Sequence, residues 1–256
     1  MKQQEITTEQ SYNIVKSNDL IQRSRFDLNV TEQKILLRLI QLICPEDTTL
    51  KTYTINIQDF CDMCGIDRNN GKNYINIKRT IQTLADKSFW VLLPDGKEAL
   101  CRWISKARIV SKSGTIELKL DDDLAPYLLQ LKKNFTAYSF YNVMGMKSKY
   151  SPRLYELIKS HEFQNNFVIG VEELKRMLCA EKYQYCNFRQ KVLDVSVKEI
   201  NDTSDIVVSY ETIKSGRKVE SIRFRVRIKN TDESLATVLT RNNNNTDCTT
   251  ECEHFE

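Results

Sequence analysis

The sequence predicts an α+β fold in which one succession of helices and strands occurs twice along the chain. Three observations support this prediction. Capping signals and apolar residues at helical spacing mark helices in both halves. Alternating apolar and polar residues mark strand pairs at 101–120 and again at 206–228. Pro152 lies in the first turn of a predicted helix and opens the second succession.

The first succession begins with a helix that carries a capping box. Asn29 is its N-cap and Glu32 its third helical residue, apolar side chains follow at helical spacing, and Pro45 ends it. The remaining elements are predicted as a strand at 52–57, a short helix at 57–64, a longer helix at 73–87, and strands at 89–93, 101–110 and 115–120.

A polar helix at 121–134 is predicted to separate the two successions. Its acidic run Asp121–Asp123 could hold Mg²⁺, but such a run more often caps a helix N-terminus, and we favour the cap. The second succession is predicted as a helix from Ser151, a strand at 167–169, helices at 171–178 and 187–200, and strands at 206–213 and 219–228.

Each succession has the order helix, strand, helix, turn, helix and β-hairpin, which is the order of a winged helix. We therefore expect two tandem winged-helix domains with pseudo-repeat architecture, the first at 13–144 and the second at 145–230. Residues 1–12 are expected to be a flexible lead-in. Residues 231–256 hold six acids and one base, and we expect a disordered acidic C-terminal tail there.

The charge of the chain is unevenly distributed. The formal net charge is +4, but without the tail the chain has 37 basic and 28 acidic residues. Residues 145–230 hold 17 bases and 11 acids, so most of the basic excess lies in the second winged helix. A moderately basic body with an acidic end indicates a polyanionic partner.

The sequence lacks the motifs of the common catalytic sites. With only 7 glycines and no GxxxxGK[ST] motif, it has no phosphate loop of an NTPase. Its two histidines, His161 and His254, cannot make the paired metal ligands of a rolling-circle nuclease, and neither has a hydrolase signature. We expect a protein that is not an enzyme and that has no cofactor.

The cysteines do not predict a metal site or a disulfide framework. Cys61 and Cys64 form a lone CxxC without two further ligands nearby, and we expect two helix thiols one turn apart. No apolar run approaches the roughly 20 residues of a membrane span, and the N-terminus lacks the apolar stretch of a secretion signal. We therefore expect a cytoplasmic protein without a membrane partner.

The helix at 187–200 has the two faces that a DNA-recognition helix needs. Phe188, Val192 and Val195 form an apolar stripe that is expected to pack inward. The opposite stripe holds donors that could reach bases or phosphates, with Arg189 beside it near the helix N-terminus. Its members are Asn187, Gln190, Lys191, Asp194 and Lys198. An ordinary solvated amphipathic helix would show the same pattern.

The closing hairpin favours the DNA-binding interpretation. Its tip carries Lys214, Arg217 and Lys218, at the position where the wing of a winged helix touches DNA. The last strand alternates apolar side chains with basic ones, which predicts a core face and a row of guanidinium groups. The basic side chains of that strand are Arg223, Arg225 and Arg227.

Several segments resemble those of the iteron-binding initiators of plasmid replication, over roughly residues 13–230. The segments that carry the resemblance are Asn18–Ile21, Phe26–Ile35, Lys149–Leu157, Asn187–Leu193, Lys198–Asn201, Val208–Ile213, the wing Lys214–Lys218 and Ile222–Phe224. Gln190 departs from the more uniformly basic run that the resemblance leads us to expect.

The resemblance implies a bacterial, plasmid-encoded protein that binds direct repeats at a plasmid origin, helps to open the duplex and recruits host replication proteins such as the replicative helicase or initiator. The second winged helix would read the iteron with Asn187–Asn201 and its wing. The first winged helix would mediate a homodimer in equilibrium with the monomer and would add DNA contacts. The dimer would repress its own promoter. Those contacts would come from Lys72, Asn76, Lys78 and Arg79. They belong to the helix at 73–87 and to the residue before it.

Two other functions remain open at this point. A winged-helix transcriptional regulator would share the DNA chemistry without the origin function. A protein-interaction scaffold would use the basic faces for acidic partners. Duplex binding that weakens steeply with salt separates the scaffold from the two DNA-binding alternatives.

Overall fold

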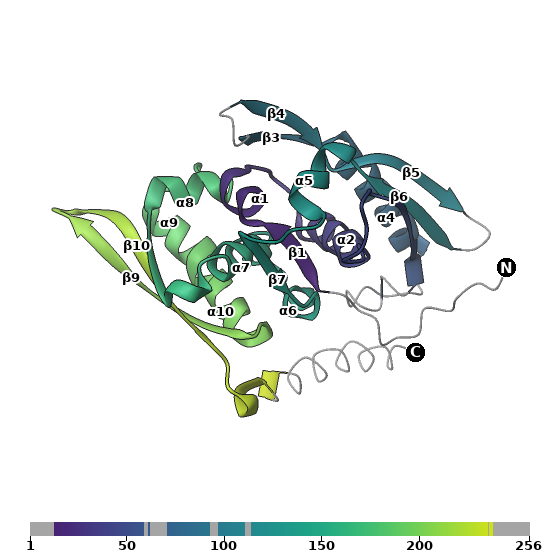
Figure 1. Cartoon of the computed structure of the whole chain (residues 1–256). Helices are drawn as coiled ribbons and strands as arrows, with labels where there is room; N and C mark the ends of the chain where they lie inside the picture. The colour runs from purple at the N-terminus through teal and green to yellow at the C-terminus, as the bar shows by residue number, and fades with distance from the viewer. Residues whose placement is uncertain are drawn as a thin grey trace, which may run out of the picture.

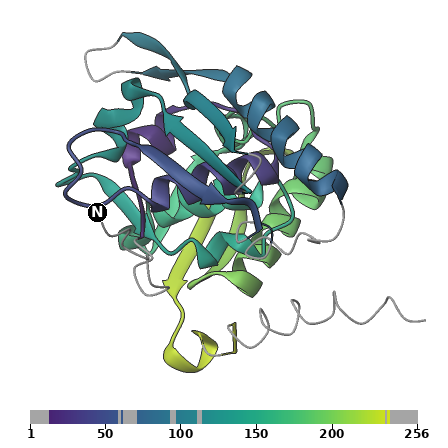
Figure 2. The same cartoon turned by 90° about the vertical axis from the view of Figure 1, so that its right-hand side faces the viewer.

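The computed structural model describes residues 13–58, 61, 71–92, 97–110, 114–234 and 236–237. Their elements form two winged-helix units that lie side by side in Figure 1 and share one apolar core. Figure 2 views the molecule from the side of the first unit, whose blue and teal elements lie nearest the viewer. The predicted lead-in at 1–12 and the predicted tail beyond residue 237 lie outside the described residues. The predicted disorder is wrong at the start of the tail, because residues 231–234 are helical and the Asn230 side chain accepts from the Glu233 N–H at 2.9 Å.

The first unit contains most of the predicted elements, and the predicted helix at 57–64 lies largely outside the described residues. The predicted strand at 101–110 is wrong as a single element, because it is two strands that belong to different sheets. The capping box is confirmed, because the Asn29 side chain accepts from the Glu32 N–H at 2.9 Å and the Glu32 carboxylate accepts from the Asn29 N–H at 2.7 Å. The elements are β1 Ile14–Ser17, α1 Asn18–Arg23, α2 Val30–Gln41, β2 Thr52–Asn56, α4 Gly71–Asp86, β3 Ser88–Leu92, β4 Glu98–Arg102, β5 Ile104–Val110, β6 Thr115–Leu120, α5 Ala125–Leu128, β7 Phe135–Tyr138 and α6 Tyr141–Met144.

The strands of the first unit form antiparallel sheets. In the order β2-β6-β5, the central strand β6 places Ile116 opposite both Ile55 and Ile109. Strands β3 and β4 form a separate hairpin, and β1 pairs with β7. The β1–β7 pair was not predicted, because each strand has four residues and its partner lies more than a hundred positions away.

The predicted helix at 121–134 is wrong over its second half. A short 3₁₀ turn at Asp122–Leu124 and helix α5 occupy its first part, and the chain becomes extended at Leu129. Gln130 and Asn134 have φ of 48° and 53°, in the left-handed region that ends a helix. The acidic run does cap the first turn, since the Asp121 carboxylate accepts from the Asp123 N–H at 3.1 Å.

The second unit follows the predicted order closely. Its central strand β10 pairs with β8 on one side and β9 on the other, so that Phe224 faces Phe167 and Tyr210 in register. The β9–β10 hairpin extends away from the body of the molecule (Figure 1). The elements from Ser151 onward are α7 Ser151–Lys159, β8 Asn166–Gly170, α8 Val171–Met177, α9 Tyr185–Phe188, a π-helical turn Arg189–Leu193, α10 Asp194–Thr203, β9 Ile206–Ser215 and β10 Lys218–Ile228.

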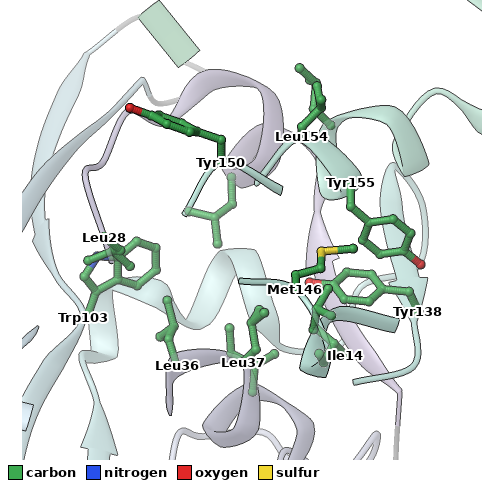
Figure 3. Packing of buried hydrophobic residues seen from close by; sticks show 14 of the residues in the cluster. Ile14, Leu28, Leu36, Leu37, Trp103, Tyr138, Met146, Tyr150, Leu154 and Tyr155 are labelled. Atoms are coloured by element: carbon green, nitrogen blue, oxygen red, sulfur yellow. The ribbon is translucent and has the colours of Figure 1, made fainter. Parts of the chain in front are cut away.

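Helix α7 packs against both units. Its Tyr155 ring meets Tyr138 of β7 edge to face, with the centroids 5.2 Å apart, and lies beside Met146 (Figure 3). Toward the second unit, the Tyr155 hydroxyl donates to Asp205 at 2.7 Å. Arg153 donates to the Ser24 carbonyl of the first unit at 2.9 Å. Contacts of α7 therefore connect the two units.

Candidate nucleic-acid interface

A continuous helical segment at residues 185–203 forms the centre of the candidate interface. It consists of α9, the π-helical turn and α10, and it begins two residues before the predicted start. Within the turn the Asp194 N–H donates to the Arg189 carbonyl, five residues earlier. A π turn contains one more residue than an α turn, so every side chain after it is rotated relative to an uninterrupted α-helix.

Because of this rotation, the apolar face of the helix differs from the predicted one. Phe188 and Val192 are buried as predicted, but Val195 is 39% exposed, so its predicted inward position is wrong. Leu193 and Ser196 are buried in its place. The apolar spacing of the sequence fits an uninterrupted helix, and nothing in the residue types marks the change of register.

The polar side chains predicted for this helix are all exposed. They are Asn187, Arg189, Gln190, Lys191, Asp194 and Lys198. One contact in this group was not predicted: Tyr210 of β9 donates a hydrogen bond to the Asp194 carboxylate, which lies beside Arg189. Tyr210 is sixteen positions away on another element, so the sequence pattern carries no signal for it.

The predicted wing is the tip of the β9–β10 hairpin. Ser215 pairs with Lys218, which leaves a two-residue turn of Gly216 and Arg217. Gly216 has a φ of 61°, as the first central residue of a type II′ turn requires. Lys214, Arg217 and Lys218 are all exposed, so the tip of the hairpin presents three cations to solvent.

The predicted row of guanidinium groups is present on β10, but each of its arginines forms an ion pair with a glutamate. Arg223 and Arg225 both pair with Glu211 of β9. Arg227 makes two hydrogen bonds of 2.7 Å to Glu233, and these bonds, with the Asn230 N–H, lower the pKa of Glu233 to about 2. We therefore leave these arginines out of the candidate interface.

Helix α4 of the first unit carries the second predicted set. Asn76, Lys78 and Arg79 are exposed, while Ile77, Ile81 and Leu84 of the same helix are buried. Lys72 belongs to α4, but its side chain lies outside the described residues. From Asn76 onward, this helix therefore has a core face and a polar face.

In the described part of the chain, the candidate site is a set of exposed surfaces. A void of about 10 Å³ in the first unit is lined by Ile and Leu side chains alone. Within the described ranges, no three His, Cys, Asp or Glu side chains converge on a metal position, and none of the helices has the length and apolar character of a membrane span. Cys61 is buried, and Cys64, its partner in the CxxC, is not among the described residues.

Comparison with known proteins assigns both units to one family. Residues 13–159 match the family described as "Initiator Replication protein, WH1", and residues 170–226 match "Initiator Rep protein, WH2". The chain is 28% identical over 227 residues to a "Replication initiation protein" of Escherichia coli, a match that spans 84% of this chain and 69% of that protein. It is 32% identical over 131 residues to the "PI protein" of Escherichia coli, over 43% of each.

A solved structure shares the fold. It is described as the crystal structure of Pi initiator protein in complex with iteron DNA, and it superposes with a TM-score of 0.71 at 20% sequence identity. The match covers 86% of this chain and 98% of that chain, so it includes both winged-helix units.

Proposed function

Because the chain belongs to the family of initiator replication proteins with WH1 and WH2 domains, we propose that it initiates plasmid replication by binding iteron repeats at the origin as double-stranded DNA. Bound there, it helps to open the duplex and recruits host replication proteins such as the replicative helicase or initiator. It acts in the bacterial cytoplasm, and it contributes binding rather than catalysis.

The observation that carries this proposal is the combination of a polar helix and a basic wing in the second unit. A recognition helix of a winged helix enters the major groove, and its exposed side chains contact base edges and phosphates. The wing supplies cations for the backbone beside it. The DNA-binding set that we propose for this unit is Asn187, Arg189, Gln190, Lys191, Lys198, Lys214, Arg217 and Lys218.

The first unit adds contacts and self-association in this proposal. Helix α4 would contact DNA through Lys72, Asn76, Lys78 and Arg79. The chain would exist as a homodimer in equilibrium with the monomer, and the dimer would repress its own promoter. The Pi protein, whose structure contains iteron DNA, has the same two-unit fold, which supports a shared mode of binding.

A replication assay in cells tests the proposal. The coding sequence with its flanking DNA is placed on a plasmid without another origin, and transformants are counted over many generations. We expect stable maintenance, and we expect loss when Lys214, Arg217 and Lys218 are together replaced by Ala. The control, which removes two cations rather than three, is Lys132→Ala with Lys133→Ala, at exposed positions of the first unit outside the proposed interface. Failure of the unaltered plasmid to replicate would contradict the initiator function and favour a transcriptional regulator.

A further inference from the structure

Arg189 and Asp194 lie next to each other only because of the π-helical turn between them. Residues five apart point about 140° away from each other around an α-helix. The wider turn, closed by the hydrogen bond from the Asp194 N–H to the Arg189 carbonyl, brings them to nearly the same side. As a result, Nε of Arg189 lies 3.7 Å from Oδ2 of Asp194.

The β9 strand fixes the other side of the Asp194 carboxylate. The Tyr210 hydroxyl donates to Oδ1 of Asp194, and the Tyr210 ring packs against Phe224 with the centroids 6.1 Å apart. Partial burial and the nearby Asp194 charge raise the pKa of Tyr210 to about 12, so the hydroxyl keeps its proton at neutral pH. Hydrogen bonding to Tyr210 and the charge of Asp194 also raise the pKa of Arg189.

Stability alone does not account for this arrangement. The Arg189 and Asp194 side chains are 57% and 46% exposed, and an ion pair so open to solvent contributes little to folding. A carboxylate beside Arg189 also disfavours a phosphate contact there, because it would repel the phosphate. With Nε facing Asp194 at 3.7 Å, the Arg189 guanidinium group has a preferred orientation, in which it can meet a base edge.

We propose that Asp194 and Tyr210 are positioning residues that orient Arg189, and that Arg189 reads one guanine of each repeat with its two Nη groups. Guanine presents two acceptors, O6 and N7, in the major groove, and a guanidinium group matches both at once. Arg189 also lies in the N-terminal half of the helical segment, from which recognition helices contact base edges. This inference rests on the proposed function.

The test measures the affinity of the full chain for one repeat duplex and for a panel in which each base pair is replaced singly. Arg189→Ala is expected to lose roughly 5- to 150-fold on the native repeat and to become indifferent to the base at one G·C pair. Arg189→Lys keeps the charge without the planar fork, so it should lose the same discrimination.

The positioning residues are tested in the same panel. Tyr210→Phe and Asp194→Asn should weaken discrimination at that same G·C pair, and Tyr210→Phe should have no further effect once Arg189 is Ala. Asp202→Asn alters another exposed aspartate of α10 and should leave the profile unchanged. The thermal unfolding midpoint of each variant is compared with that of the native chain. A lowered midpoint identifies a loss of affinity that comes from misfolding.

Three results would overturn the inference: Arg189→Ala weakening all duplexes equally, Asp194→Asn tightening binding to every duplex, or additive effects of Arg189→Ala and Tyr210→Phe. The first would assign Arg189 to a phosphate. The second would make Asp194 a source of repulsion only. In all three cases the unaltered chain would still prefer the repeat, whereas failure of the proposed function would remove that preference itself.

Discussion

Nζ of Lys16, on β1, lies 2.6 Å from Oε1 of Glu156, on α7, and the two side chains are only 3% and 4% exposed. Arg153 supplies a second cation, 3.7 Å from Oε2, and the Tyr138 hydroxyl also donates to Glu156. Burial lowers the pKa of Lys16 despite the attraction of Glu156. This cluster ties the first strand of the first unit to the helix that both units share.

We predict that Glu156→Gln destabilises the chain by about 3–5 kcal/mol, because it leaves two buried cations without their counter-charge. Equilibrium unfolding in urea measures the change. The control is Asp122→Asn, which removes the partner of Lys119 in an ion pair whose aspartate is 69% exposed, and which should cost less than about 1 kcal/mol. Equal effects of the two substitutions would show that the buried cluster has no special role.

The same cluster predicts a loss of stability in acid. Burial raises the pKa of Glu156, but the charges of Lys16 and Arg153 outweigh it, so the net pKa is lowered. The unfolded chain therefore binds this proton first as the pH falls. The contribution of Glu156 is complete above its unfolded pKa and is lost as the pH falls through the folded one. Between about pH 6 and pH 3, the urea midpoint of unfolding should fall less steeply with pH for Glu156→Gln than for the native chain. Midpoints that fall in parallel for the two proteins would contradict the prediction.

The register after the π-helical turn can be tested by two neighbouring truncations. Leu193 is fully buried and Val195 is 39% exposed, so Leu193→Ala should cost about 2–5 kcal/mol and Val195→Ala less than about 1 kcal/mol. Urea unfolding distinguishes them directly. An uninterrupted α-helix would require Val195→Ala to be the more damaging of the two.

Lys191 is exposed on the recognition helix, and we predict that it reads a base. Lys191→Ala should then lose about 1–3 kcal/mol on the repeat and relax specificity at one position. Fluorescence anisotropy with singly substituted duplexes measures both effects, with Lys132→Ala as a charge-matched control. A uniform loss on all sequences would assign Lys191 to a phosphate instead.

The sequence predicts those features of the fold that depend on local chemistry. The capping box at Asn29, the proline at position 152 and the alternation along β9 and β10 each carry their own signal, and the structure contains each element. The β1–β7 pair and the shared position of α7 depend on contacts between residues far apart in the chain, which no local pattern reports.

The candidate site was predictable in its residue types but not in its geometry. Charge and amphipathicity identify the helix and the wing. The π-helical turn depends on which carbonyl accepts from the Asp194 N–H. The ion pairs of Arg225 and Arg227 depend on acids from a neighbouring strand and from the helical segment after β10. The domain limits at 144 and 230 stay predictions.

The central claim is that this chain recognises repeated DNA, and duplex binding tests it most directly. Fluorescence anisotropy compares tandem repeats from beside the coding sequence with a scrambled duplex of the same composition, at several salt concentrations. We predict that the repeats bind at least about 10³-fold more tightly than the scrambled duplex, and that affinity falls steeply between about 50 and 200 mM salt as phosphate contacts are screened. Equal affinity for both duplexes, or affinity that salt does not change, would contradict the claim.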